Sequence, residues 1–394
     1  MSLGEFRPAV WPPFPLPPHD GGGADLDLEA LRALATRDSG LCDFGPPAFM
    51  QAAAVLVDSL RREGRLNARG RARAVAAIRR SLQVQLWLQH EVALDPAVSR
   101  RPVASPVVIV GMAGAGMERL QRLLVQDPAN RTPAVCDPRA PAAALARPVM
   151  LGGKPAALSA SREAVAAPLE EAFDCAALLA HGFVGSHLEY AHRAPAWAAW
   201  CRASADWKPV YAMHRRLLQM YRGEGGAPRW ILASADHLRH LREILAVYPD
   251  AHVIHVHRDP AAALAEAGAA CCAVRRLGSE EVDAAEIGQA MLEDAAWGVD
   301  RMLQQRHRAP LRGRVLDILH HDLCKDPIGT VELIYGMFAI PFTVRALRRM
   351  QEFVRVAWDT ASAPALAAVD LSAAAVHGRF ADYMDLHGIR REVQ

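Results

Sequence analysis

The sequence predicts an α/β protein in which helices cover both faces of a central parallel sheet, preceded by a helical region. After residue 102, short and continuously apolar runs alternate with stretches of helical periodicity, the pattern of parallel strands buried on both faces. The first of these runs enters a glycine-rich turn, whereas the residues before 102 show helical periodicity alone. With 394 residues, 52% of them hydrophobic, the chain is long enough to bury such a core.

The composition excludes several function classes. A formal net charge of +2 gives no reason to expect a nucleic-acid partner or electrostatic binding to a membrane surface. Every apolar run is interrupted by Arg, His or Pro before it reaches membrane-spanning length, so no transmembrane segment is expected. The first residues lack a basic stretch followed by an apolar one, which favours a cytoplasmic location over secretion.

The cysteines indicate free thiols rather than a disulfide framework or a metal site. Seven cysteines are scattered along the chain, and no CxxC pair occurs among them. An odd number without paired spacing is typical of reduced thiols in a cytoplasmic protein. Metal sites of the usual local spacing are therefore excluded, and we expect no metal.

Three segments follow one another along the chain. Residues 1–24 form a Pro/Gly-rich lead that cannot be helical, and residues 25–101 carry helical patterns, with Asp25 or Asp27 as the first cap. A long helix with one basic face ends this region, and we interpret its arginines as a solvated surface. Residues 102–394 form the α/β domain, in which residues 140–225 look helical and lack a strong strand.

Four strand–helix units build the expected sheet. The tail "GRFADYMDLHGI" adds a short helix. The expected pairs are strand 107–112 with helix 117–126, strand 230–234 with helix 236–248, strand 252–258 with helix 260–274, and strand 314–323 with helix 328–338.

The glycine-rich turn after the first strand has the geometry of an anion site. Gly111, Gly114 and Gly116 permit a tight turn and close backbone approach, and the helix that begins near Met117 directs its unpaired N–H groups into the turn. A Walker loop would end in Gly-Lys-Ser/Thr, but here the residues are Gly116-Met117-Glu118. This excludes a kinase or NTPase. The alternative is a turn that merely joins a strand to a helix.

A second candidate lies at the end of the strand 252–258. His257-Arg258-Asp259-Pro260 follows it, and proline is favoured at the first position of a helix. Arg258 would lie at the carboxyl end of a parallel strand, where open α/β sheets bind ligands, and an arginine there can hold a phosphate with two hydrogen bonds. The alternative is a structural ion pair of Arg258 with Asp259 or Glu266.

Taken together, these segments resemble the bacterial sulfotransferase family of the mycobacterial type, whose members use the sulfate donor PAPS. The resemblance runs from "GLCDFG" at 40–45 to "GRFADY" at 378–383. The family's loop reads G-x-P-R-S-G-T-T, and its central unit reads W-V-L-K-S-P-x-H-L, a helix, and F-P-D-A-x-I-V-x-x-H-R-D-P. The residues found in register are Trp230, Leu232, Ser234, His237, Leu238, Tyr248-Pro249-Asp250-Ala251 and His257-Arg258-Asp259-Pro260.

Two further segments carry the same resemblance. Residues 318–342 resemble the family's later strand, "DL..DP" and helix, and residues 207–219 resemble its substrate-side helix. The resemblance implies a P-loop-type sulfotransferase fold whose helical insertion at about 140–225 forms the acceptor side.

The resemblance also implies a donor site, at which this chain departs from the family. The family's loop arginine and hydroxyls hold the 5′-phosphosulfate of PAPS, and the RDP arginine with a downstream serine holds its 3′-phosphate. The implied donor-binding positions are here occupied by Gly111, Gly114 (family Arg), Ala115 (Ser), Gly116, Met117 and Glu118 (both Thr), Arg258 and Glu266 (Ser). The strand lysine is replaced by Ala233. Of the side chains expected to touch phosphate or sulfate, Arg258 alone is kept.

These replacements lead to a hypothesis about the site. A carboxylate is stabilised at a helix N-terminus, so we expect Glu118 to fold back and occupy the anion hole, while Glu266 would neutralise Arg258. The alternative is that Arg119, Arg122 or Arg239 supplies the missing positive charge.

Two function hypotheses follow. The first is transfer of a sulfuryl group from PAPS to a hydroxyl of a small molecule, lipid or glycoconjugate, with no metal, through a degraded donor site. The second is a catalytically inactive homologue that binds a ligand or partner in the retained cleft. His181 and His214 lie in stretches that resemble the acceptor side and are the candidate bases. A homodimer is left open.

Overall fold

The computed structural model describes residues 26–133, 150–151, 154–155, 174–220, 229–308, 314–358 and 366–393. The Pro/Gly-rich lead and Asp25 lie outside these ranges, as does a large part of the expected insertion at 140–225.

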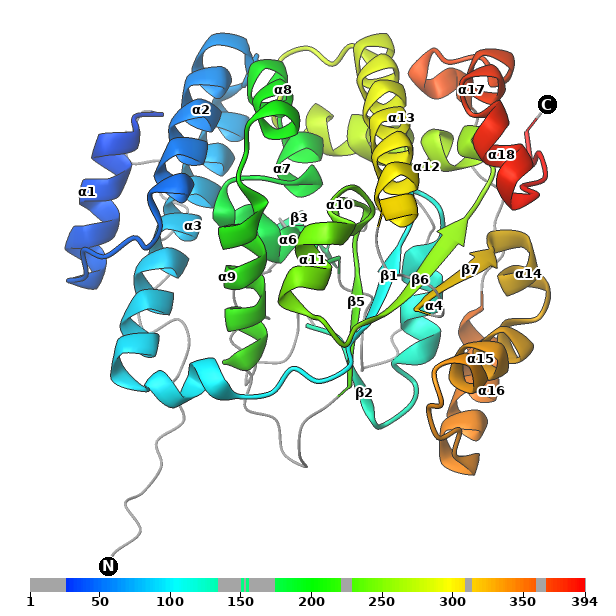
Figure 1. Cartoon of the computed structure of the whole chain (residues 1–394). Helices are drawn as coiled ribbons and strands as arrows, with labels where there is room; N and C mark the ends of the chain where they lie inside the picture. The colour runs from blue at the N-terminus through cyan, green and yellow to red at the C-terminus, as the bar shows by residue number, and fades with distance from the viewer. Residues whose placement is uncertain are drawn as a thin grey trace, which may run out of the picture.

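A five-stranded sheet forms the centre of the structure, and all its paired strands run parallel (Figure 1). The strand order is β2-β5-β1-β6-β7, which confirms the predicted α/β class. The edge strand β2 was not predicted, because it contains two residues with no apolar run. The strands are β1 (Val107–Val110), β2 (Asn130–Arg131), β5 (Arg229–Ala233), β6 (His252–His257) and β7 (Val315–Leu319). A separate antiparallel pair joins β3 (Met150–Leu151) and β4 (Lys154–Pro155).

The central strands β1, β5 and β6 are buried on both faces, which explains why β1 reads as a continuous apolar run. In β1, Val107 and Ile109 pack into a core with α4 (Met117–Leu124), α15 (Pro327–Met337) and α16 (Val344–Ala357). Val108 and Val110 point the other way and join the larger core under the remaining helices. A strand with apolar residues on both faces cannot alternate in polarity.

The helical region predicted at 25–101 is present as three helices. They are α1 (Leu28–Ser39), α2 (Pro47–Glu63) and α3 (Ala68–Leu94). The side chain of Asp27 caps α1 by accepting from the N–H of Ala30, and proline opens α2. The arginines of α3 do lie in its first half, but its residues 81–88 are buried on every side. The second half of α3 is therefore a core helix rather than an amphipathic surface helix.

A layer of helices covers the sheet on the side of the larger core. Figure 1 shows α9 between the strands and α1–α3 on the left, with α13 near the upper ends of β1 and β6. The helices of this layer are α6 (Ala176–Leu179), α7 (Ser186–Ala191), α8 (Pro195–Ala203), α9 (Trp207–Gln219), α10 (Ala235–Arg239), α11 (Leu241–Val247), α12 (Pro260–Arg276) and α13 (Ala284–Arg308). The helical character expected before residue 225 thus holds over the described residues 174–220.

Two predicted elements differ in detail. The strand expected at 314–323 ends at Leu319, and the rest of that segment is the helix α14 (His320–Lys325). The single helix expected at 236–248 is divided into α10 and α11 at His240. The tail contains α17 (Ala373–Arg379) and α18 (Ala381–His387), and short 3-10 turns occur at Pro96–Arg100, Ala180–Gly182 and Leu366–Val369.

The topology gathers three chain segments at one edge of the sheet. Strands β1, β6 and β7 are neighbours and parallel, so their carboxyl ends meet. The glycine loop 111–116 follows β1, Arg258 follows β6, and His320 follows β7. This edge is where open α/β sheets bind ligands. Within the described residues, no helix is both long and apolar enough to cross a membrane.

The backbone of the glycine loop leaves no room for a side chain at Gly114. Its φ is +79°, and a Cβ placed there would lie 2.2 Å from the carbonyl oxygen of Ala263. We expect Gly114→Ala to lower the free energy of unfolding by about 1–3 kcal/mol, measured by urea denaturation followed by circular dichroism. The control is Gly378→Ala in α17, where a Cβ meets no atom within 4 Å; it should raise stability slightly. A Gly114→Ala chain as stable as wild type would contradict the loop geometry.

Candidate functional site

The glycine loop presents an open helix start to any anionic group. Gly114 and Gly116 both adopt positive φ, and the N–H of Ala115 closes the turn onto the carbonyl of Met112 at 3.0 Å. Gly116 is the N-cap of α4, and no side-chain oxygen caps the helix there. The first N–H groups of α4 therefore depend on an acceptor that is not the cap residue.

Glu118 brings a carboxylate to this helix start. It lies in the first turn of α4. Burial and the nearby charge of Glu266 raise its pKa, while a hydrogen bond from its own backbone N–H lowers it. The carboxyl of Glu118 thus lies beside its own backbone N–H in the first turn of α4, and it is close enough to Glu266 for the two groups to repel when both are charged.

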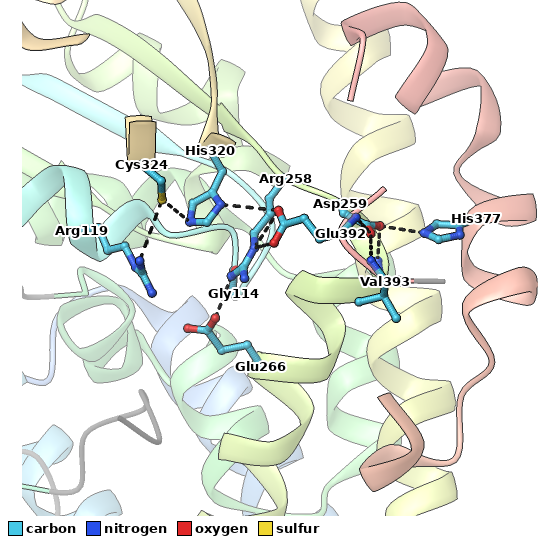
Figure 2. A network of polar contacts seen from close by, with 11 residues as sticks. Gly114, Arg119, Arg258, Asp259, Glu266, His320, Cys324, His377, Glu392 and Val393 are labelled. Carbon is cyan, nitrogen blue, oxygen red and sulfur yellow. Dashed lines mark hydrogen bonds and ion pairs between the residues drawn. The ribbon is translucent and has the colours of Figure 1, made fainter. Parts of the chain in front are cut away.

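Arg258 is buried and bound by three groups (Figure 2). Its Nη1 donates to the carbonyl oxygen of Gly114 and to Oε2 of Glu266, both at 2.7 Å. Its Nε donates to Oε2 of Glu392 at 3.1 Å. The expected pair of Arg258 with Glu266 is therefore formed, and a second acid from the chain's tail adds to it. The guanidinium tethers the loop, α12 and the tail to one point.

Glu392 also faces His320, the first residue of α14. One of its oxygens lies 3.5 Å from Nδ1 of His320. Although burial opposes ionisation of both groups, His320 and Arg258 lower the pKa of Glu392, and Cys324 and Glu392 raise the pKa of His320. The ring of His320 packs against the loop, because a Cβ on Gly116 would lie 2.6 Å from it.

Asp259 holds the tail in place. Its Oδ1 caps α12 by accepting from the N–H of Ala261 and meets Nε2 of His377 at 2.9 Å. Its Oδ2 accepts from the backbone N–H groups of Glu392 and Val393 at 2.6 and 3.0 Å. Figure 2 shows the tail brought alongside Arg258 by these bonds. The position of Glu392 is thus fixed by backbone contacts as well as by its own charge.

Residues 106–344 match the sequence profile described as the Sulfotransferase family, more than half of the chain. The chain belongs to the sulfotransferase family.

Two solved sulfotransferases have similar structures. Sulfotransferase STF9 from Mycobacterium avium is 24% identical, with a TM-score of 0.79 over 93% of this chain and 98% of that one. Sulfotransferase STF1 from Mycobacterium tuberculosis H37Rv is 26% identical, with a TM-score of 0.74 over 90% of this chain and 98% of that one. The predicted sulfotransferase fold is confirmed. No curated protein sequence matches the chain.

The three arginines considered as substitute cations have other surroundings in this sulfotransferase. Arg122 stacks over the ring of Phe353 at 5.4 Å, and Arg239 is buried between Asp236 and Asp294. Arg119 approaches Sγ of Cys324 at 3.9 Å. Arg119 is therefore the one of the three whose contact reaches the group around Arg258 and His320.

The two histidines proposed as bases lie inside the helical layer. Nδ1 of His181 is 3.1 Å from Oγ of Ser81, and Nδ1 of His214 is 2.8 Å from the hydroxyl of Tyr248. Both histidines are buried, and burial lowers the pKa of His214 to about 3. To act on an acceptor hydroxyl, either would need the helical layer to open.

A different acid in this sulfotransferase has the pKa of a general base. Glu189 of α7 lines a small cavity with Asp236, Arg239, Asp294 and three tryptophans. Burial and the charge of Asp294 raise the pKa of Glu189 to about 7, so it exchanges a proton near neutral pH. Nothing in the local sequence "SHLEYA" indicates this, because the effect depends on residues from α10 and α13.

Sequence reasoning also missed the residues that surround Arg258. Glu392 and His377 carry no local signal, since only the folded tail brings them to the loop. His320 and Cys324 did carry a local signal, because two residues four positions apart on a helix lie on the same face. The error in the predicted length of that strand hid this spacing.

The contacts of Cys324 lower the pKa of its thiol. Sγ lies 3.4 Å from Nε2 of His320, and although burial opposes it, His320 and Arg119 lower its pKa. The thiolate of Cys324 should therefore persist at pH values below the usual pKa of a cysteine thiol.

We expect iodoacetamide at pH 6.5 to alkylate Cys324 faster than the more exposed Cys42, with the modified sites identified by mass spectrometry. His320→Asn should abolish this advantage; equal rates at both cysteines in wild type would refute it.

Proposed function

We propose that this member of the sulfotransferase family keeps its donor cleft filled by its own carboxylates, and that the chain as folded is an inactive homologue which binds a ligand or partner rather than PAPS. The observation that carries the proposal is the capture of Arg258. Arg258 is the donor-site cation that the family resemblance retains, and it is committed to Glu266 and Glu392.

Charge supports the same conclusion at the loop. Glu118 and Glu266 occupy two positions at which the resemblance implies side chains that hold PAPS, Glu392 binds the same arginine as Glu266, and position 114 offers no side chain. An incoming donor would bring several negative charges against three acids in a partly buried place. Sulfuryl transfer depends on stabilising charge at the transferring group, so these acids oppose both binding and catalysis.

Calorimetric titration with PAP, the desulfonated donor, tests the proposal. Wild type should show no binding at micromolar concentration. The triple variant Glu118→Gln, Glu266→Ser, Glu392→Gln should bind PAP, with each removed carboxylate tightening binding about tenfold or more. The matched control is Glu29→Gln, which removes an exposed carboxylate on α1 that pairs with Arg32.

Two results would count against this assignment. Micromolar binding of PAP by wild type would mean that the carboxylates leave the cleft on their own. A folded triple variant without affinity for PAP would mean that the missing loop arginine and strand lysine, rather than the added acids, abolish the site.

A second candidate function is sulfuryl transfer from PAPS to a hydroxyl of a small molecule, lipid or glycoconjugate. One observation favours it: Glu189, whose pKa is raised to about 7, lines a small cavity. In this case Glu189 would accept the proton of the acceptor hydroxyl as the sulfuryl group leaves PAP.

This candidate predicts a role for Glu189 in turnover. In the triple variant supplied with PAPS and a panel of hydroxyl acceptors, Glu189→Gln should slow PAP release about 10²–10⁴-fold, while the affinity for PAP is unchanged. Glu293→Gln, an exposed acid on α13, is the control. Turnover that is insensitive to Glu189→Gln would eliminate this residue as the base.

A further inference from the structure

Three metal-ligating side chains meet inside the helical layer. Cys175 precedes α6, His214 lies on α9, and His237 lies on α10. One ligand atom from each lies within 4.8 Å of the other two. All three residues have a relative exposure of 0%. A thiol and two imidazoles are therefore held together away from solvent.

Each imidazole is oriented by a tyrosine and left with one unpartnered nitrogen. Nδ1 of His214 is 2.8 Å from the hydroxyl of Tyr248, and Nδ1 of His237 is 3.0 Å from the hydroxyl of Tyr211. The Nε2 atoms of both rings are buried and make no hydrogen bond to any residue that the structure describes. Two buried polar atoms without partners are costly for a folded chain, unless something absent from the protein itself binds them.

The tyrosine contacts also determine which nitrogen of each ring faces the other ligands. When Nδ1–H donates to the tyrosine oxygen, Nε2 carries the lone pair that a metal needs. A polar group that fixes the ring through Nδ1 is the usual second partner of a metal-binding histidine.

We propose that Cys175, His214 and His237 bind a Zn²⁺ ion through Sγ and the two Nε2 atoms. A thiolate with two imidazoles is a ligand set that Zn²⁺ accepts. In a tetrahedral site the three ligand atoms would be about 3.3–3.6 Å apart, and one ligand atom of each residue already lies within 4.8 Å of those of the other two. On binding, the Cys175 thiol loses its proton to solvent and the sulfur–zinc bond forms.

The ion would join three segments that the chain keeps far apart. The N–H of Cys175 donates to the carbonyl of Ala233 at 2.8 Å, which ties this residue to the end of β5. His237 follows the same strand, while His214 comes from α9. Zinc would thus fasten α6 and α9 to the sheet. The ligands are 214 − 175 = 39 and 237 − 214 = 23 residues apart, so no motif with close spacing reveals them.

A second cluster, formed by His255, His257 and Asp317, does not support a metal. Asp317 already accepts two hydrogen bonds from Arg306, at 2.6 and 2.8 Å, and one from His257 at 2.9 Å. A metal there would have to displace a guanidinium. No such competitor is bonded to Nε2 of His214 or His237.

Metal analysis of the full-length chain tests the proposal without any assay of sulfuryl transfer. Protein purified without chelators should contain about one zinc ion per chain, measured by elemental mass spectrometry. After removal of zinc, titration with Co²⁺ should produce a thiolate-to-cobalt absorption band that Zn²⁺ then abolishes. A chain with native circular dichroism that neither retains zinc nor gives the cobalt band would overturn the proposal.

Variants assign the ligands. Cys175→Ser should remove the thiolate band and weaken Zn²⁺ binding at least tenfold, whereas Cys271→Ser, a buried cysteine on α12, should change neither. If Cys175→Ser fails to fold, Tyr211→Phe and Tyr248→Phe keep all three ligands and should weaken binding about 10–100-fold. Zinc binding unaffected by Cys175→Ser, or by both tyrosine variants, would refute this site.

Discussion

The buried guanidinium of Arg258 is the contact on which the functional edge of this sulfotransferase depends. A buried cation is tolerated only when its donors are satisfied, and here the partners are a loop carbonyl, an acid two helical turns along α12, and an acid of the tail. Removal of any one of them leaves at least one donor of the buried guanidinium without its present partner. The arrangement in which Glu266 and Glu392 bind Arg258 is therefore also the one that satisfies its donors.

The parallel sheet, though not the order of its strands, could be predicted because burial on both faces leaves a clear trace in the sequence. The run at 107–110 is continuously apolar, those at 229–233 and 252–257 are mainly so, and Pro260 marks the start of the helix after β6. The two-residue strand β2 has no such trace. Its place at the sheet edge is fixed by pairing with β5.

The candidate site was predictable in part. The family resemblance related Glu118 to the loop and Glu266 to Arg258, because each pair of positions lies within one short segment of the chain. Glu392 reaches the same point only because Asp259 binds the tail backbone. Likewise, the environments of Glu189 and His214 depend on side chains from helices that are remote in sequence, and no local pattern encodes their pKa values.

The backbone at Gly114 makes a cation at this loop position difficult to introduce. With φ at +79° and the carbonyl of Ala263 in the space of a Cβ, an arginine introduced here by a single substitution meets the backbone of α12 before it can meet a ligand. That helix, or the loop, would have to move first. The order of changes therefore matters: a lineage or a protein engineer seeking to restore a donor-binding arginine must first remodel the contact between the loop and α12.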